Sequence, residues 1–325
     1  MQSNIKERIS EIRNQCNLIK PLLVVRCITY NHENYIHDAL NGFVMQKTKF
    51  PFVAIVHDDA STDRTADIIG EYAEKYPNII LPIFEKENQY SKQDGSIGNI
   101  MNKAIEATGA KYIAMCEGDD YWIDSCKLQK QVDYLEAHSD YTMCFTSASV
   151  VYENLNITKI SNAFNRVESR DYDIKECFNN WIIPTCTIVY RSYIIDKIPL
   201  DNRFKVGDNV LTTTCFKYGK VRAMKELTAT YRRTISGWTS QSIYDRSQLA
   251  IDHTKVLKEY FHEYRSVFDK YLVKCNTTRT LYSLMKFDRR FFTYVSLGFK
   301  DFGMRYVLYL MIHPVNSLLK KCLIR

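Results

Sequence analysis

Short apolar runs alternate with amphipathic patterns along the first 120 residues of the chain. Four runs of five to seven residues are rich in valine, isoleucine and other apolar side chains, as buried strands are: Leu22 to Ile28, Phe52 to Val56, Asn78 to Phe84 and Tyr112 to Cys116. Between them, apolar residues recur every three or four positions, which indicates one-sided helices. Strands that alternate with helices predict an α/β fold with a mainly parallel sheet flanked by helices.

The pattern becomes more mixed after about residue 140. One helix and three strands are indicated there: Asp208 to Tyr218 before Gly219, and Met143 to Thr146, Cys186 to Tyr190 and Val221 to Tyr231. We expect this part of the sheet to include antiparallel strands. From about Gln241 onward the pattern is helical. The predicted organisation is a charged N-terminal segment (1–20), an α/β domain (21–240) with halves at 21–125 and 126–240, and a helical C-terminal region (241–325).

The composition fits an ordinary globular protein of 325 residues, 46% of them hydrophobic. The ten cysteines are scattered without a Cys-x-x-Cys pair or a zinc-like Cys/His spacing, which is typical of reduced, mostly buried thiols. The first twenty residues lack the apolar core of a signal peptide, and no apolar run approaches about 18 residues. We therefore expect a cytoplasmic protein that is neither exported nor membrane-spanning.

The net charge of +7 is concentrated toward the C-terminal end. Phe261 to Arg325 contains twelve lysines and arginines against four aspartates and glutamates, and aromatic residues are interleaved with the cations. Two interpretations stay open: a helical face that lies peripherally on the anionic inner face of the cell membrane, or a helical subdomain whose aromatics pack on a core. Nucleic acid is not an expected partner, because the cations are spread over many turns without a recognised motif.

Carboxylates gather directly after two of the predicted strands. Glu117, Asp119 and Asp120 follow the fourth apolar run, and Asp58 and Asp59 follow the second. In open α/β sheets the carboxyl ends of the strands form the edge where ligands bind, so these acids are expected at one rim. So dense a cluster repels itself unless a cation neutralises it. Mg²⁺ and Mn²⁺ take oxygen ligands and leave positions for phosphate oxygens, which favours a site for a metal ion and a diphosphate.

Four ordered motifs lie at suitable spacing along roughly residues 21 to 240. They are Thr29-Tyr30-Asn31-His32-Glu33, His57 to Thr65, Glu117-Gly118-Asp119-Asp120-Tyr121-Trp122 with Lys127 to Gln131, and Gly207-Asp208-Asn209. In this combination the chain resembles the family 2 inverting glycosyltransferases of bacterial surface-polysaccharide type. The resemblance implies the GT-A fold with its Rossmann-like sheet, a nucleotide-activated sugar as donor, a divalent metal, and transfer with inversion to an acceptor hydroxyl.

The resemblance also implies roles for the acidic residues. Glu117 matches the first aspartate of the family's D-x-D pattern and Asp119 matches the last. Asp119 is therefore the predicted direct ligand of Mn²⁺ or Mg²⁺, with Asp120 as the second choice, while Glu117 acts through water or ribose. A metal that bridges this carboxylate to both phosphates would neutralise the leaving group. An exposed acidic loop without metal is the less favoured alternative.

By the same match, Asp59 would accept a hydrogen bond from the nucleotide base. The Thr29 to Glu33 loop, with Tyr30 and Asn31 at its centre, would wrap the base and the ribose. For Asp58, Ser61 and Asp63, turn formation and helix capping through side-chain oxygens are the favoured roles. Asn31 and His32 are also compatible with plain turn positions.

Inversion in a single displacement requires a general base near the acceptor hydroxyl, and a carboxylate suffices. Asp208 is the candidate that the resemblance implies, because it follows Gly207 and opens a predicted helix as the family's base does. Capping of that helix is its alternative role. Flat aromatic faces for a sugar acceptor are offered by Tyr121, Trp181 and Trp238, although packing in a core is the commoner role of such residues.

The chain departs from the family in two places. Gly98 to Asn102 stands where many members have Arg-Asn-x-Gly, and Thr234 stands where many have the histidine of a Tyr-Arg-x-His segment. Arg232 or Arg233 would then clamp the diphosphate instead. The small polar loop 235–242 suits either a lid over the donor or an ordinary surface loop.

The sequence thus predicts a metal-dependent inverting glycosyltransferase. It would move a hexosyl unit from a nucleotide-diphosphate sugar, a uridine one in the first instance, to a hydroxyl of a glycan or lipid-linked acceptor in surface polysaccharide or glycoconjugate synthesis. Two alternatives stay open: a nucleotidyltransferase acting on a sugar phosphate, and a non-catalytic glycan- or nucleotide-binding module of the same fold.

Overall fold

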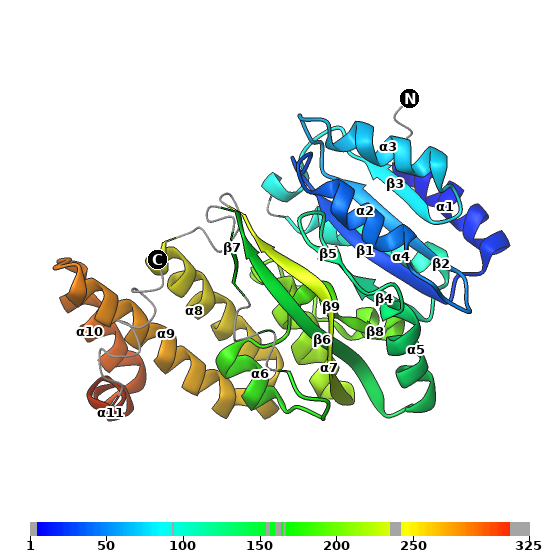
Figure 1. Ribbon diagram of the computed structural model, residues 1–325. Helices are drawn as coiled ribbons and strands as arrows, with labels where there is room; N and C mark the ends of the chain where they lie inside the picture. Colours follow the sequence, from blue (N-terminus) through cyan, green and yellow to red (C-terminus); the bar gives the residue numbers. More distant parts are fainter. Residues whose placement is uncertain are drawn as a thin grey trace. The chain divides into compact units, whose positions relative to one another are not determined.

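The computed structural model of the protein describes residues 5–92, 94–153, 157–159, 164, 167–234 and 242–312. The chain forms two compact units. The first, here called the sheet unit, comprises Met1–Asn202 and Leu211–Ile235, and the second, the helical unit, comprises Arg203–Val210 and Ser236–Arg325. Figure 1 shows the sheet unit as a twisted sheet with helices on both faces. This is the predicted mixture of α/β architecture and a helical C-terminal extension.

The first half of the sheet is parallel, as expected. The strand β1 (Leu23–Thr29) pairs with β2 (Phe52–Asp58) and with β4 (Tyr112–Met115), and β2 also pairs with β3 (Ile80–Phe84). Every residue of β2 and β4 is buried. Strands covered on both faces need such continuous apolar runs, which is why they were visible in the sequence.

Helices cover both faces of this half of the sheet (Figure 1). Successive strand residues point to opposite faces. Val25 and Ala54 belong to the cluster that includes α2 (Ile36–Val44) and α3 (Thr65–Lys75). The alternate residues, such as Val24, belong to the cluster that includes α1 (Ile5–Ile19) and α4 (Ser96–Thr108). The predicted charged N-terminal segment is therefore largely a helix, with Ile12 and Cys16 buried.

The second half of the sheet mixes directions, as predicted. Its longest strands, β6 (Tyr141–Tyr152) and β9 (Lys220–Arg233), pair in parallel. The strand β8 (Val189–Arg191) is antiparallel to both β4 and β6, and β7 (Ile157–Lys159) is antiparallel to β6. The described strands follow the order β3-β2-β1-β4-β8-β6-β9-β5, with β7 paired to β6. The prediction of one strand over 186–190 was wrong in its first part, because Thr185–Thr187 forms a 3₁₀ turn.

The short strand β5 (Tyr121–Trp122) pairs with β9 at the far end of this order, antiparallel. The chain therefore leaves β4 in the middle of the sheet and crosses to β9 through residues 116–120. These are the residues of the predicted acidic motif. The acidic motif is thus held at both of its ends by strand pairing.

Three further helices complete the sheet unit or extend from it: α5 (Lys127–Ala137), α6 (Ile174–Asn180) and α7 (Gly207–Tyr218). Helix α7 begins one residue before the predicted start at Asp208, and Gly219 follows its last residue. Helix α6 begins with a capping box, in which the Asp173 carboxylate accepts from the Glu176 N–H and the Glu176 side chain accepts from the Asp173 N–H.

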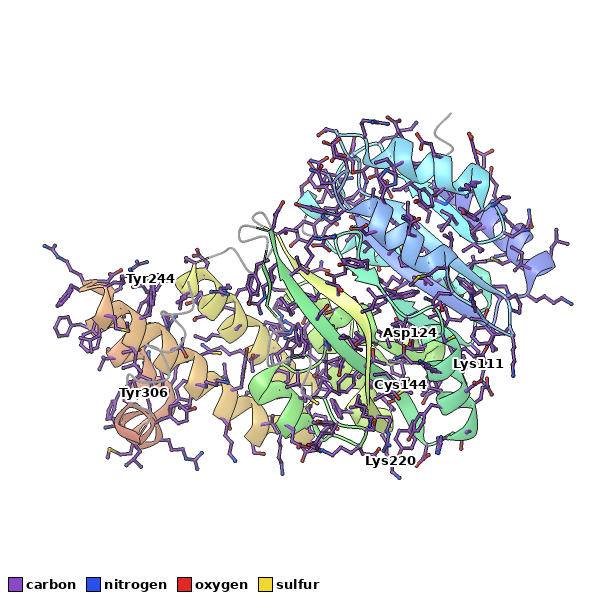
Figure 2. All side chains as sticks on the ribbon, in the orientation of Figure 1. Lys111, Asp124, Cys144, Lys220, Tyr244 and Tyr306 are labelled. Carbon is purple, nitrogen blue, oxygen red and sulfur yellow. The ribbon has the colours of Figure 1, made fainter. Side chains whose placement is uncertain are left out.

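The helical unit contains α8 (Ile243–Tyr260), α9 (Arg265–Met285), α10 (Arg290–Phe302) and α11 (Met304–Ile312). Tyr306 is fully buried, and a Cβ atom on Gly298 would lie only 2.3 Å from its ring, so only glycine lets α10 and α11 pack this closely. Figure 2 shows Tyr306 on α11 and Cys144 on β6, a fully buried residue of the other unit. None of the described helices combines the length and the apolar character that a membrane span needs.

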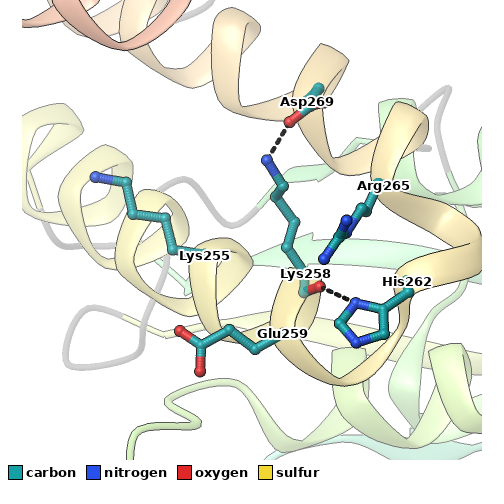
Figure 3. A pocket seen from close by; sticks show the side chains of 6 residues that line it. All are labelled: Lys255, Lys258, Glu259, His262, Arg265 and Asp269. Atoms are coloured by element: carbon teal, nitrogen blue, oxygen red, sulfur yellow. Dashed lines mark hydrogen bonds and ion pairs between the residues drawn. The ribbon is translucent and has the colours of Figure 1, made fainter.

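A surface hollow of about 580 Å³ lies in the helical unit between the end of α8 and the start of α9 (Figure 3). Charged side chains line it: Lys255, Lys258, Glu259, His262, Arg265 and Asp269. Lys258 forms an ion pair with Asp269, and Glu259 forms one with Arg203 at 2.7 Å. One ion pair joins two of the lining residues, whereas Glu259 and Lys255 pair with Arg203 and Asp301 outside the lining.

A buried lysine joins α5 to β5. Lys127 is completely buried, donates to Gln131 Oε1 at 2.7 Å, and lies 4.5 Å from the ring centre of Trp122. The Trp122 N–H in turn donates to the carbonyl of Cys186 at 2.7 Å. Burial lowers the pKa of Lys127 from 10.5 to about 8. The segment Lys127 to Gln131, which follows the acidic residues in the sequence, therefore has a structural role, because its buried Lys127 side chain packs against Trp122.

Replacement of Lys127 by methionine (K127M) tests this burial. Below pH 8 the lysine is protonated in both folded and unfolded chains. Between pH 8 and 10.5 the folded protein releases the proton first, so the unfolded state binds more protons and stability rises with pH. We expect the free energy of unfolding of the parent protein to gain up to roughly 3 kcal/mol relative to K127M over this window. Urea denaturation at pH 7, 8, 9 and 10 measures the difference.

The matched control is K130M on the same helix, whose lysine is largely exposed and paired with Asp124 at 2.7 Å. The hydrogen bond that the Lys130 ammonium donates to Asp124 raises the pKa of Lys130, so the parent should show no such gain relative to K130M. Parallel stability profiles for the parent and K127M would contradict the burial of a titrating amine.

Candidate active site

The ends of β1, β2 and β4 lie side by side, and the segments after them carry most of the predicted site residues. Thr29 is opposite Asp58 in the parallel pair. The Asp59 N–H donates to the Thr29 carbonyl at 2.9 Å, and the Gly118 N–H donates to the Ile28 carbonyl at 3.0 Å. Three of the four sequence motifs therefore meet at one edge of the sheet, as the order of strands and helices predicted.

The first carboxylate of the acidic loop, which we define as residues 116–122, is bound to β1 through both oxygens. Arg26 Nη1 donates to Glu117 Oε1 at 2.6 Å, and the Ile28 N–H donates to Oε2 at 2.8 Å. Charge-assisted hydrogen bonds of this kind fix a carboxylate firmly. Glu117 therefore anchors the start of the loop, an arrangement compatible with the indirect role predicted for it.

The third carboxylate of the loop points into the protein. Asp120 is 3% exposed, and its Oδ1 accepts from the Arg232 N–H at 2.7 Å. Burial, with the neighbouring Asp119 carboxylate, raises the pKa of Asp120 well above its usual range. Asp120 therefore attaches the acidic loop to β9. This contact accounts for the residue without a metal.

The middle carboxylate has no such protein partner. Within the described residues, Asp119 takes part in no salt bridge, although it is only partly exposed. Burial raises the pKa of the Asp119 carboxyl and Glu117 adds to the rise, whereas His32 and Arg232 oppose it. A carboxylate that is crowded by other acids and lacks a cation is one that a bound divalent ion would stabilise.

Two buried polar atoms face the loop beside Asp119. Thr29 Oγ1 and His32 Nδ1 are buried without a hydrogen-bond partner in the described part of the chain. A Cβ atom on Gly118 would lie 2.5 Å from the first and 3.0 Å from the second. Buried polar atoms need partners, and a metal ion with a diphosphate would bring some. The residues present therefore fit such a group.

No described cluster of three or more His, Cys, Asp or Glu side chains forms a complete metal site. Around Asp119, most coordination positions of an ion would therefore fall to diphosphate oxygens and water, a common arrangement for Mg²⁺ in nucleotide enzymes.

The loops after β1 and β2 are tied into one structure. Asn31 has φ 53°, in the left-handed region, and its Oδ1 accepts from the Thr62 N–H at 2.8 Å. The Glu33 N–H donates to Asp63 Oδ2, and the Arg64 N–H donates to Glu33 Oε2, each at 3.1 Å. Asp63 Oδ1 accepts from the Thr65 N–H at 2.9 Å, which confirms its predicted role in the turn. The N-cap position of α3 is occupied by Arg64, whose side chain makes no cap hydrogen bond. The predicted contacts of Asn31 and Glu33 with a nucleotide stay predictions.

Asp58 and Tyr30 lie in the same two loops, where the first has a structural role and the second is exposed. Asp58 accepts from the Ser61 N–H at 3.1 Å, which closes the turn as predicted. Tyr30 is 43% exposed, which makes it the most exposed ring-bearing side chain of the Thr29 to Glu33 loop. A stacking surface for a base is therefore available there.

Asp59 is fully buried and binds a segment that the sequence did not single out. Its Oδ1 accepts from the Gln89 N–H at 2.7 Å, and its Oδ2 accepts from the Tyr90 N–H at 3.0 Å. Each oxygen keeps a further lone pair. The predicted hydrogen bond from a nucleotide base to Asp59 is compatible with these contacts and stays a prediction.

A buried pair lies beside Asp59. His57 Nε2 is 3.1 Å from Glu85 Oε1, and Gln89 Nε2 donates to Glu85 Oε2 at 3.2 Å. Sequence reasoning left His57 without a role and missed Glu85 altogether. No local pattern signals such a pair, because it joins the ends of two strands 28 positions apart.

Arg232 and Arg233 occupy different surroundings. Arg232 donates through Nη1 to the Asp119 carbonyl and through Nη2 to Asp38 Oδ2, both at 2.7 Å. Arg233 donates to the Tyr152 hydroxyl at 3.0 Å. Among the described contacts, neither guanidinium donates to a carboxylate of the acidic loop, although the Arg232 N–H donates to Asp120 Oδ1. Their predicted contacts with a diphosphate stay predictions.

Asp208 lies in the first turn of α7, within Arg203–Val210, the segment that belongs to the helical unit. Its predicted role as the base stays a prediction. Trp181 is partly buried and packs against the core of the sheet unit, so its core role is supported. Tyr121 lies with its ring 5.0 Å from the Arg232 guanidinium. Trp238 and residues 235–241 of the proposed lid lie outside the described residues.

The sequence profile of Glycosyl transferase family 2 matches residues 25–199, more than half of the chain. The chain belongs to this family. Over 228 residues it is 37% identical to the uncharacterized protein Rv1520 of Mycobacterium tuberculosis, which covers 67% of this chain and 61% of that protein. The chain thus spans about three fifths of the length of this relative.

Solved structures show the same fold. Residues 1–349 of Staphylococcus aureus TarS in complex with UDP-GlcNAc match with a TM-score of 0.53 and 17% identity, covering 79% of this chain and 81% of that one. TarS is a poly(ribitol-phosphate) β-N-acetylglucosaminyltransferase. The mannosyltransferase PcManGT of Pyrobaculum calidifontis, with GDP-Man and Mn²⁺, matches with a TM-score of 0.54 and 12% identity, covering 95% and 96% of the two chains. This member of Glycosyl transferase family 2 therefore has the GT-A fold.

Replacement of Gly118 by alanine (G118A) tests how closely the acidic loop must approach β1. The new methyl group would lie 2.5 Å from Thr29 Oγ1 and 2.7 Å from Thr29 Cβ. We expect a loss of about 1–3 kcal/mol in the free energy of unfolding from this overpacking, measured by urea denaturation. The control is G98A in α4, where nothing lies within 4 Å of the added Cβ. It should leave stability unchanged or raise it by up to about 1 kcal/mol, and equal effects of both changes would contradict the close packing.

Proposed function

We propose that the protein is a metal-dependent inverting glycosyltransferase that uses a nucleotide-diphosphate sugar, UDP-linked in the first instance. The observation that carries the proposal is the acidic loop: two of its three carboxylates are bound to the protein and Asp119 has no described salt-bridge partner. The family membership and the neighbour solved with UDP-GlcNAc support a nucleotide-sugar donor. The neighbour solved with Mn²⁺ supports a divalent ion.

Asp119 would hold the ion. Asp120 would not contact the ion and would only attach the loop to β9. A bound Mn²⁺ or Mg²⁺ supplies a Lewis acid that neutralises the charge developing on the diphosphate leaving group. Thr29 and His32 would bring their buried polar atoms to the same side of the loop. Glu117 would act at a distance, since Arg26 and β1 already bind its oxygens.

The nucleotide would lie along the loops after β1 and β2. Tyr30 would face the base with its exposed ring, and Asp59 would accept a hydrogen bond from it. The bonds between Asn31 and Thr62 and between Glu33 and Arg64 make the two loops one rigid wall. Rigid walls of this kind lower the entropic cost of binding.

Asp208 would act as the general base that takes the proton of the acceptor hydroxyl as the sugar–phosphate bond breaks. The acceptor class follows from the relatives rather than from the geometry. TarS glycosylates a poly(ribitol-phosphate) by its name. We therefore propose a hydroxyl of a surface glycan or lipid-linked acceptor as the substrate that receives a hexosyl unit.

The two central residues are tested with D119N and D208N. A thermal-stability screen of nucleotide sugars, with and without Mn²⁺, should find one donor that raises Tm only when the ion is present. D119N should lose this metal-dependent rise, because it removes the ligand charge. D208N should keep the rise and lose turnover by at least about a hundredfold, since a general base contributes about 10²–10⁴ in rate.

D133N, at an exposed position of α5, is the matched control and should behave as the parent does. Equal metal-dependent stabilisation of D119N and the parent would reject Asp119 as the ligand. Release of pyrophosphate from a nucleoside triphosphate would instead identify a nucleotidyltransferase. Full function of D208N would favour a binding module or a different base.

The helical unit carries a second proposal, contact with an anionic membrane. Seven large apolar residues are exposed between 284 and 308: Leu284, Phe287, Phe292, Leu297, Phe299, Met304 and Leu308. Phe287 is 96% exposed and has φ 50°, a left-handed conformation that costs a bulky residue about 1–2 kcal/mol. The end of α9 offsets this cost within the protein, because the Phe287 N–H donates to the Leu284 carbonyl at 3.1 Å and the Asp288 N–H donates to the Ser283 carbonyl at 2.9 Å. The exposed ring itself is left for a partner outside the protein.

The charges of the same segment indicate the kind of partner. Five exposed cations surround the apolar residues: Lys286, Arg289, Arg290, Lys300 and Arg305. Only Asp288 and Asp301 oppose them between residues 284 and 308. Aromatic side chains among cations suit the interface of an anionic bilayer, where rings enter the headgroup region and cations meet lipid phosphates. A peripheral position at the inner face of the cell membrane follows from this proposal.

The membrane contact is tested with the double variant F287S/F292S. Sedimentation with phosphatidylglycerol vesicles should show at least about tenfold weaker partitioning than for the parent, because two exposed rings no longer enter the bilayer. Phosphatidylcholine vesicles should bind the parent poorly. The control L18S/Y90S removes two residues of the sheet unit that are 86% and 66% exposed. If F287S/F292S partitions as the control does, the membrane contact is rejected.

A further inference from the structure

Arg232 contacts both aspartates of the acidic loop through its backbone and its side chain. Its N–H donates to Asp120 Oδ1, and its Nη1 donates to the carbonyl oxygen of Asp119, each at 2.7 Å. The first bond lies next to the paired strands β5 and β9, in which Tyr121 is opposite Thr230. The second bond reaches the backbone of Asp119 itself. One residue at the end of β9 thus sets the position of two consecutive residues in the loop.

The other arm of the guanidinium is held by α2. Arg232 Nη2 donates to Asp38 Oδ2 at 2.7 Å, and the two side chains are 11% and 50% exposed. The guanidinium lies 4.8 Å from the ring centre of Tyr35 and 5.0 Å from that of Tyr121. Tyr35 is itself anchored, because its hydroxyl donates to Glu153. A planar fork that binds in two directions while flanked by two rings has little freedom to move.

We propose that Arg232 is a positioning residue for Asp119 and that Asp38 orients it. The inference rests on the proposed function of Asp119 as the metal ligand, and it assigns the guanidinium to the backbone of the loop rather than to the diphosphate. The Asp119 carbonyl and the Asp38 carboxylate together use both terminal nitrogens of the fork. The guanidinium therefore holds the backbone of Asp119 and makes no described hydrogen bond to its carboxylate, which remains partly exposed.

The two possible roles of Arg232 predict opposite effects of removing Asp38. If Arg232 positions Asp119, loss of Asp38 releases the guanidinium and weakens metal-dependent binding. If Arg232 instead binds the diphosphate directly, loss of Asp38 removes a competitor, so binding is unchanged or becomes tighter. Asp38 lies half exposed on α2 and holds no ligand in either case, which makes it the informative position.

The experiment compares R232K, D38A and D38N in the full-length protein. Isothermal titration with UDP over a range of Mn²⁺ concentrations should show about tenfold weaker binding for R232K and D38A, the size typical of lost partners around a metal ligand. D38N keeps an oxygen acceptor and should fall between D38A and the parent. Hydrogen exchange measured by mass spectrometry should increase in the peptide that covers 116–122 in R232K and D38A, without any ligand present.

R222K and D171A are the matched controls, because Arg222, on the same strand as Arg232, forms a similar ion pair with Asp171 at 3.2 Å, outside the acidic loop. They should change neither UDP binding nor exchange in the 116–122 peptide. Unchanged exchange of this peptide in D38A and R232K, or tighter binding of UDP by D38A, would overturn the positioning role. A parent protein that fails to bind UDP with Mn²⁺ while the exchange pattern appears as expected would instead overturn the proposed function.

Discussion

The arrangement of the site depends on how the protein distributes the repulsion among three carboxylates within four residues. Glu117 is neutralised by Arg26 and a backbone N–H of β1. Asp120 is buried against the backbone of β9. Asp119 lies between them and has no described ion pair. Because both neighbours are engaged by the protein, the charge without a described ion pair is confined to one side chain, and this carboxylate is the one proposed to bind the metal.

The surrounding structure serves to hold this loop in place. The loop crosses from β4 to β9 and is paired with strands at both ends. Gly118 permits contact with Thr29 on one side. Beneath the loop, Trp122 binds the carbonyl of Cys186, and the buried Lys127 lies against its ring. A buried amine with a lowered pKa destabilises the folded state, and the hydrogen bond to Gln131 and the contact with the Trp122 ring offset part of this cost.

The helical unit differs from the sheet unit in which side chains it buries and which it exposes. Its interior includes polar residues such as Asn276, Arg279 and Thr280, which bond to one another and to the backbone. Its surface keeps large apolar residues and cations together between 284 and 308. The left-handed Phe287 ends α9, where its N–H and that of Asp288 satisfy two carbonyls of the last turn. Its exposed ring and the neighbouring cations are the basis of the proposed contact with an anionic surface.

The sequence by itself determined the parts of this protein that depend on local pattern. The buried parallel strands, the helices between them and the carboxylates at the strand ends all follow from periodicity and chain order, because a parallel sheet brings the ends of its strands to one edge. Only the tertiary structure decided which carboxylate remains open. Glu117, Asp119 and Asp120 look alike in the sequence, and their partners lie on β1 and β9, 91 and 112 positions away. The link from Asp38 to Arg232 spans 194 positions. Contacts of this range leave no local signal, since they arise from the packing of whole elements.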